Sequence, residues 1–253
     1  AKRENKFMSN PDYIYGMHPV MEAIKSNKDI DKIFIQSDLR GPHITELRKL
    51  IKQSGISSQN LPLGRLNHMY KKNHQGVVAF LSPIEYQPYQ AVIQQVFESG
   101  RDPLVLVLDR VSDVGNFGAI CRTVECMGVD VVIIPVKGSA PLNSEAIKRS
   151  SGALLTINLC KEKDLAAVCE DLKGSGLKII GCTEKAEDSV FEMDYTGPAA
   201  IVMGCEEDGI NSTIMKQLDD SVRIPLQGDI ASLNVSVAAG IVLAQALKQR
   251  IGN

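Results

Sequence analysis

Residues 104–122, LVLVLDRVSDVGNFGAICR, decide the architecture of this chain. The first five side chains are all apolar, which is typical of a parallel strand that is covered on both faces. A polar turn follows, and then a helical stretch, GAICRTVECMG at 118–128. A buried strand, a polar turn and a helix form the repeating unit of α/β folds. The stretch therefore predicts a parallel sheet with helices on both faces.

The same alternation continues to about residue 250. Helices are predicted at 144–152 (SEAIKRSSG), at 163–176 (KDLAAVCEDLKGSG) and in a last segment that contains IVLAQAL. Strands are predicted between them, at VDVVIIP (129–135), LLTINL (154–159), LKIIGCT (177–183), AAIVMG (199–204) and SVRIPL (221–226). Strands that alternate with helices favour one parallel sheet over residues 102–253.

A smaller α/β unit precedes this sheet, over residues 1–83. It is predicted from two helical stretches and two strands, MEAIKS (21–26), DKIFIQS (31–37), ITELRKLIKQSG (44–55) and VVAFL (77–81). Residues 84–101 are predicted to be a linker and a helix, because SPIEYQPYQ contains two prolines and AVIQQVFESG follows it. We therefore expect two domains with a short connection.

Composition narrows the class of protein. The chain has 253 residues and no apolar run of about 18, so no membrane span is expected. Its N-terminal sequence has no apolar signal region, so we expect a cytoplasmic protein. Its six cysteines form no CxxC pair and no zinc-binding spacing, so we expect reduced thiols and no metal. The net charge of −2 is uneven, +4 over residues 1–100 and −6 over residues 101–253. The basic first part hints at a polyanionic partner, although a solvated surface would have the same charge.

Three polar, glycine-containing turns follow strands of the predicted sheet. They are LDRVSDVGNFG (108–118), MGCEEDG (203–209) and IPLQGDIASLNVS (224–236). Ligands of open parallel sheets bind at the carboxyl ends of the strands, so the three turns are predicted to line one site.

Standard motifs do not explain that site. The chain has no GxxxxGK[ST], no GxGxxG and no GxSxG sequence. All four histidines lie within the first 74 residues, which excludes a Ser-His-Asp triad confined to the second part. The remaining Asn, Arg, Glu and Ser side chains suit positioning and charge stabilisation.

The three turns, in this order, resemble the sequence motifs of the SpoU (TrmH) branch of the SPOUT methyltransferases. YIYGMHPVMEAI (13–24) and HQGVVA (74–79) resemble the L30e-like RNA-binding domain that is fused to these enzymes. The resemblance implies a C-terminal deep trefoil knot, S-adenosyl-L-methionine as cofactor, no metal, and a homodimer that methylates RNA at the ribose 2′-hydroxyl. It points most closely to the branch that modifies a guanosine of 23S ribosomal RNA. Transfer RNA as substrate, and a non-catalytic RNA-binding factor of ribosome assembly, are the alternatives.

The resemblance also implies a set of site residues. The candidate catalytic residues are Asn116, Arg122, Glu206, Ser232 and Asn234, and the candidate cofactor-binding residues are Gly204, Ile224, Leu226 and Leu233. An arginine remains protonated below a pH of about 12, so we expect Arg122 to stabilise developing alkoxide charge rather than to act as a base. The alternatives are a salt bridge of Arg122 to Asp109 or Glu125, and simple helix capping by Asn234.

Four residues of the first domain are candidates for RNA contact: Tyr15, His18, His74 and Gln75. Aromatic and imidazole rings can stack on unpaired bases. For each of the four, an ordinary surface or core position is the alternative.

Overall fold

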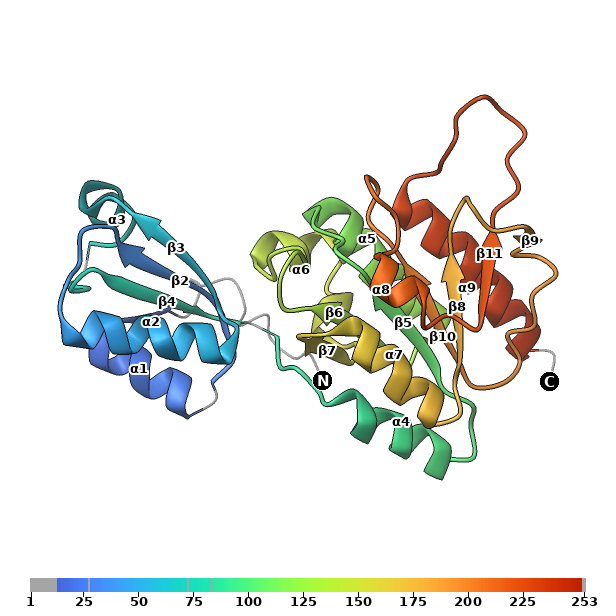
Figure 1. The fold of residues 1–253 in the computed structure, drawn as a ribbon, viewed down its shortest axis with the longest axis horizontal. Coiled ribbons are helices and arrows are strands. Elements are labelled where there is room, and N and C mark those ends of the chain that lie inside the picture. The colour runs from blue at the N-terminus through green and yellow to red at the C-terminus, as the bar shows by residue number, and fades with distance from the viewer. Residues whose placement is uncertain (1–12, 27, 72, 83, 252–253) are drawn as a thin grey trace, which may run out of the picture. The chain divides into compact units, whose positions relative to one another are not determined.

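The computed structural model describes residues 13–251 except residues 27, 72 and 83. The chain divides into two compact units between Glu85 and Tyr86, and residues 142–144 group with the first unit. Each unit has its own sheet and its own hydrophobic core (Figure 1).

The first unit is a small mixed sheet with helices. Its elements are β1 (Tyr13–Tyr15), α1 (Met17–Lys25), β2 (Ile30–Gln36), α2 (Pro42–Ser54), β3 (Ser57–Leu61), α3 (Leu63–Met69) and β4 (Val77–Leu81). Four strands of the described residues pair in the order β1-β4-β2-β3, and only β2 and β3 are parallel. Apolar residues of α1 and α2 pack on one face of this sheet, around Val20, Ile33 and Leu47. Helix α2 ends at Gly55, whose left-handed backbone (φ 71°) stops the helix as the sequence predicts.

From Tyr86 onward, strands and helices alternate. The elements are α4 (Tyr89–Glu98), β5 (Leu104–Leu108), α5 (Val114–Met127), β6 (Val131–Pro135), α6 (Ser144–Arg149), the 3₁₀ turn η1 (Ala153–Leu155), β7 (Leu159–Glu162), α7 (Leu165–Gly174), β8 (Lys178–Cys182), β9 (Asp188–Ser189), β10 (Ala199–Met203), α8 (Ser212–Met215), β11 (Asp220–Arg223) and α9 (Val235–Ile251).

The large sheet is parallel throughout. Within the described residues it has seven strands in the order β7-β6-β5-β10-β8-β11-β9. All five residues of β5 are buried, because its alternate side chains meet helices on opposite faces. Helices α4 and α7 pack on one face around Val105 and Val107, and α5 and α9 lie side by side (Figure 1). The predicted α/β class is therefore confirmed, whereas the trefoil knot stays a prediction.

The sheet order brings the three polar turns together. Strands β5 and β10 are neighbours in register, so Leu108 pairs with Met203 and both strands end at the same edge. The N–H of Asp109 donates to the carbonyl of Met203 at 2.8 Å, which continues the pairing into the turns. Strand β11 is separated from β10 only by β8, and its carboxyl end lies at the same edge.

The strand expected near LLTINL (154–159) lies later in the chain than predicted. Residues 154–158 are not a strand, because Gly152 adopts a left-handed backbone (φ 89°) and the chain continues from α6 into η1. The hydroxyl oxygen of Ser150 accepts the Leu154 N–H at 3.2 Å and stabilises this turn. Strand β7 begins only at Leu159, where pairing with Val132 of β6 starts.

No helix among the described residues combines the length and the apolar character that a membrane crossing requires.

Candidate active site

Three polar side chains, one from each turn, form a hydrogen-bonded triangle at the carboxyl edge of the large sheet. Asn116 Nδ2 donates to Glu206 Oε1 at 3.0 Å. Asn234 Nδ2 donates to the same Glu206 oxygen at 2.8 Å and to Asn116 Oδ1 at 2.9 Å. These residues are 28 to 118 positions apart in sequence, so only the fold brings them together.

The start of α5 fixes Asn116. Asp113 is the N-cap residue of this helix, and its side-chain oxygen accepts the Asn116 N–H at 2.7 Å. A carboxylate at a helix N-cap satisfies an N–H that has no partner within the helix and interacts favourably with the helix dipole. The cap therefore holds Asn116 where its amide can reach Glu206.

Asn234 has two functions at once. Its Oδ1 accepts the Ser236 N–H at 3.0 Å and the Ser236 hydroxyl at 2.5 Å, which caps α9. Its Nδ2 faces Glu206 and Asn116 instead. Because the amide uses one end for each set of contacts, capping by Asn234 is confirmed and is compatible with the predicted role of this residue in the site, which stays a prediction.

A pocket of about 310 Å³ lies beside the triangle, between the ends of β8, β10 and β11 and the start of α9. All four predicted cofactor-binding residues line it, namely Gly204, Ile224, Leu226 and Leu233, and so do Glu206 and Ser232. Asn116 and Asn234 touch the pocket only through Glu206. The volume is at the lower end of the range for small-molecule sites, about 300–1,000 Å³.

The turn at Gly204 has room only for glycine. A Cβ at this position would lie 2.1 Å from the carbonyl carbon of Gly209, because the loop folds back on itself. The Gly209 N–H donates to the Cys205 carbonyl at 3.1 Å and closes the loop. This tight turn is what places Glu206 at the mouth of the pocket.

The structure sets Arg122 apart from the other candidates. It is exposed on α5, it does not line the pocket, and it makes no hydrogen bond or ion pair with any residue that the structure describes. The alternative salt bridge to Asp109 is not formed, because Asp109 pairs with Arg110. Within one chain, Arg122 is therefore separate from the Asn116–Glu206–Asn234 triangle.

The end of β8 forms a wall of the pocket that the sequence analysis did not include. Cys182, Thr183, Glu184 and Lys185 line it. The same strand-end rule that selected the other three turns applies here, and a search of every strand end would have found this segment. Burial raises the pKa of the Cys182 thiol to about 11, so it stays protonated at neutral pH and is a poor nucleophile.

In the first unit, the RNA-contact candidates differ in exposure. Tyr15, His18 and Gln75 are exposed, and the ring of His18 lies 5.1 Å from that of His43. His74 is buried: its Nδ1 accepts the Gly76 N–H at 3.0 Å, and its Nε2 lies 2.9 Å from Asn67 Oδ1. The core alternative therefore describes His74 better than base stacking does.

The second unit thus combines a parallel sheet, a pocket at the carboxyl ends of its strands and an amide–carboxylate triangle beside that pocket. This arrangement is that of an α/β protein with a ligand site at its strand ends. The SpoU rRNA methylase family model matches residues 103–244. A second model, described as RNA 2′-O ribose methyltransferase substrate binding, matches residues 13–87. The chain belongs to the SpoU rRNA methylase family and is an RNA ribose 2′-O-methyltransferase of the TrmH type.

Individual proteins agree with this family. A TrmH family tRNA/rRNA methyltransferase of Staphylococcus saprophyticus is 35% identical over 94% of this chain and 95% of its own length. The 23S rRNA (guanosine-2′-O-)-methyltransferase RlmB of Vibrio vulnificus is 33% identical over 97% of this chain and all of its own. The fold is similar to that of the SpoU methyltransferase AviRb from Streptomyces viridochromogenes in complex with AdoMet, with a TM-score of 0.61, 21% identity, and coverage of 95% of this chain and 91% of that one.

Proposed function

We propose that this protein transfers the methyl group of S-adenosyl-L-methionine to the ribose 2′-hydroxyl of a guanosine in 23S ribosomal RNA. The observation that carries the proposal is the Asn116–Glu206–Asn234 triangle at the edge of the pocket. Similarity to the RlmB of Vibrio vulnificus over nearly the whole chain supports ribosomal RNA as the substrate.

The pocket suits the proposed cofactor chemically. Met203, Ile224, Leu226 and Leu233 offer apolar contacts for a flat base. Four acidic residues of the lining, Glu184, Glu206, Glu207 and Asp208, outnumber the lysine Lys185 and favour a cationic ligand. The turn at Gly204 brings the backbone close to whatever occupies the pocket. When bound, the cofactor supplies a methyl group on a sulfonium, which is electrophilic without covalent help from the protein.

The task left to the protein is to position the ribose hydroxyl and stabilise the charge that develops on it. Hydrogen bonds from Asn116 and Asn234 hold the Glu206 carboxylate in one orientation, so that it can accept a hydrogen bond from the target nucleotide. Ser232 lines the pocket beside it and is free to contact phosphate or base. Arg122 is proposed to contribute the fixed positive charge.

We propose that the protein acts as a homodimer through α9. The buried side of this helix carries Val235, Ala239, Val242, Leu243 and Ala246. Residues 237–244 are all apolar, and on the side away from the core Val237 is 51% exposed and Ala244 is exposed. The last turns carry Gln245, Lys248 and Arg250 instead. Exposed apolar side chains that lie together on one helix mark a surface for a protein partner, so a second copy of the chain is the proposed cover of residues 237–244.

The dimer gives Arg122 a site. Helix α5 packs against α9, so the exposed Arg122 lies on the helix that neighbours the exposed apolar residues of α9. We infer that Arg122 of one protomer completes the pocket of the other, since it does not line the pocket of its own chain.

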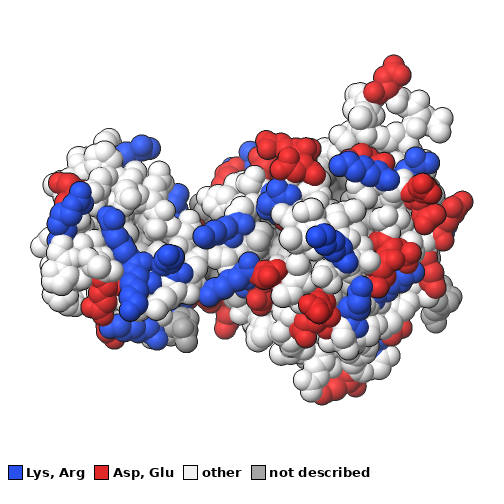
Figure 2. All heavy atoms as spheres, in the orientation of Figure 1, with Lys and Arg blue, Asp and Glu red and all other residues white. Residues whose placement is uncertain are grey.

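The first unit is proposed to bind RNA. Lysines and arginines lie over α1 and α2 with acidic side chains among them, and the second unit also carries both signs of charge (Figure 2). Lys28, Arg48, Lys49 and Lys52 are exposed on or beside these helices and suit contact with phosphates, whereas Lys25 pairs with Glu22 and Glu46. With Tyr15, His18 and Gln75 they form the proposed RNA-binding surface. An enzyme with this substrate is expected in the cytoplasm.

The substrate is tested by label transfer from methyl-tritiated S-adenosyl-L-methionine to protein-free 23S ribosomal RNA and, in parallel, to bulk transfer RNA. Digestion identifies the labelled nucleoside. We expect 2′-O-methylguanosine from 23S RNA. Label only in transfer RNA would support the proposed reaction and contradict ribosomal RNA as its substrate. No label in either RNA, together with no cofactor binding, would favour a non-catalytic RNA-binding factor.

A further inference from the structure

Arg110, in the turn after β5, has a backbone conformation that is uncommon for a residue other than glycine. Its φ of 59° lies in the left-handed region. For a residue with a side chain this costs about 1 kcal/mol or more, and such residues persist only where surrounding contacts hold them. Gly138 leaves space for the side chain, because a Cβ there would lie 3.2 Å from Arg110 Cγ. A strained residue that is accommodated in this way indicates a specific task for its guanidinium.

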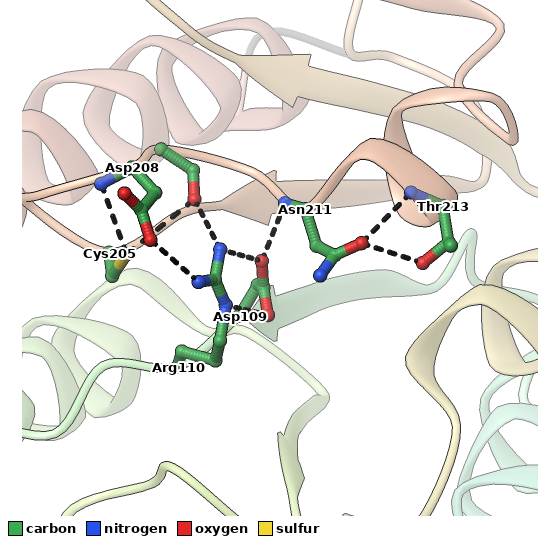
Figure 3. A network of polar contacts seen from close by, with 7 residues as sticks. Asp109, Arg110, Cys205, Asp208, Asn211 and Thr213 are labelled. Carbon is green, nitrogen blue, oxygen red and sulfur yellow. Dashed lines mark hydrogen bonds and ion pairs between the residues drawn. The ribbon is translucent and has the colours of Figure 1, made fainter.

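The guanidinium joins the end of β5 to the loop after β10 (Figure 3). Its Nε and Nη2 donate to Asp109 Oδ1 and Oδ2 at 3.1 and 3.2 Å. Its Nη1 donates to Asp208 Oδ2 at 3.1 Å, and Nη2 also donates to the Gly209 carbonyl at 3.1 Å. The hydrogen bonds from Arg110 to Asp109 raise the pKa of Arg110 further, so the group stays charged throughout the working range.

Asp109 fastens the far end of the same loop. It is buried, and its Oδ2 accepts the Asn211 N–H at 2.7 Å in addition to the bond from Arg110. The loop of residues 204–211 is thus tied to β5 at Asp208, Gly209 and Asn211 through one arginine–aspartate pair.

This loop forms one wall of the pocket. Gly204 and Glu206 belong to it, together with Cys205, Glu207, Asp208 and Gly209, and all of them line the pocket. Arg110 itself is not among the pocket-lining residues of the described chain. Its bonds therefore act on the pocket only through the loop.

We propose that Arg110 is a positioning residue of the methyl-transfer site: by tying residues 208 and 209 to Asp109 at the end of β5, it fixes the loop that presents Gly204 and Glu206 and thereby sets cofactor affinity. The proposal rests on the proposed function, in that the ligand of this loop is S-adenosyl-L-methionine. Arg110 contacts neither that ligand nor RNA in this account.

The hydrogen bonds of Arg110 to Asp109 and to Asp208 differ in their exposure to water, and this difference guides the choice of variants. Asp109 is buried and pairs with two guanidinium nitrogens, whereas the side chain of Asp208 is 72% exposed and its ion pair is screened by water. Arg110→Ala removes the ties to Asp208 and Gly209 and leaves the hydrogen bond between Asn211 and Asp109. Arg110→Lys keeps the charge without the planar fork. Arg149→Ala is a matched control that breaks an exposed arginine–glutamate pair elsewhere.

The first measurement is cofactor affinity by calorimetry, together with kcat and KM. We expect Arg110→Ala to raise the Kd and the KM for the cofactor about tenfold, Arg110→Lys to restore part of this loss, and Arg149→Ala to stay within about twofold. A merely structural role would reduce the folded fraction, which lowers the apparent kcat and leaves the cofactor KM unchanged. That pattern would overturn the proposal.

The second measurement needs no ligand. Amide hydrogen exchange of the unliganded protein should become faster at Gly209 and Asn211 in Arg110→Ala, while exchange within β5 and β10 stays slow. Unchanged exchange in this loop would refute the positioning role even if the enzyme methylates RNA. If the wild-type protein binds no S-adenosyl-L-methionine, the proposed function fails instead, and the exchange result alone decides whether Arg110 fixes the loop.

Discussion

At the residue scale, Glu206 Oε1 is the point on which the site converges. It accepts hydrogen bonds from Asn116 and Asn234, and the Val235 N–H lies 3.4 Å away. Sequence motifs identify these three polar residues, but their hydrogen bonds follow from sheet order, which no local pattern encodes. The role of Arg110 is equally hidden in the sequence, because its partners Asp208 and Gly209 are 98 and 99 positions away.

Substitution of Asn234 separates its capping role from its role in the triangle. Serine is as good an N-cap as asparagine but cannot donate to Glu206 and Asn116. We expect Asn234→Ser to keep the free energy of unfolding within about 0.5 kcal/mol of the wild type, and Asn234→Ala to lower it by about 1 kcal/mol. Both variants should lose at least about tenfold in methyl transfer, as one lost hydrogen-bond donor to a charged group predicts. Denaturant titration measures the free energy of unfolding, and label transfer measures methyl transfer. If Asn234→Ser kept full activity, Asn234 would act only as a helix cap.

At the element scale, the parallel sheet follows from the apolar strands, and the caps at Asp113, Gly55 and Asn234 follow from residue type. Short polar elements were not predictable in the same way. Strand β3 has the sequence SSQNL, with four exposed residues, and forms only because it pairs with β2 at the edge of its sheet. The strand expected near 154–159 shows the converse, since most of that apolar run is a turn held by Gly152 and Ser150 and β7 begins only at Leu159.

The tight loop after β10 gives a prediction at this scale. Gly204→Ala places a methyl group 2.1 Å from the Gly209 carbonyl carbon, so the loop must open. We expect a loss of about 2 kcal/mol in the free energy of unfolding and a loss of cofactor binding. Gly228→Ala is the control, because nothing lies within 4 Å of its Cβ position. Calorimetry that finds equal cofactor affinity in the two variants would contradict the assignment of this pocket.

At the scale of the whole molecule, the two units divide the proposed work between RNA binding and chemistry. The apolar side of α9 and the isolated position of Arg122 both point beyond a single chain. Neither feature could be evaluated from the sequence, since an apolar C-terminal helix is equally compatible with complete burial in a monomer.

The proposed dimer is tested by placing a charge among the exposed apolar residues of α9. Val237→Glu puts a carboxylate into the proposed interface, where burial without a partner is costly, so we expect a monomer that has lost activity. Leu155→Glu is the control, because Leu155 is exposed outside α9. Sedimentation equilibrium measures the mass of each variant. A Val237→Glu protein that remains dimeric would contradict an interface through α9.

The central claim is that Glu206 of one protomer and Arg122 of the partner act in one methyl-transfer site, and mixed dimers test it most directly. Arg122→Ala and Glu206→Gln homodimers should each be nearly inactive. A purified dimer with one protomer of each kind contains one intact site, so we predict about half of the wild-type methyl transfer to RNA. Mixed dimers that remain as inactive as both parents would contradict the account, as would full activity of the Arg122→Ala homodimer.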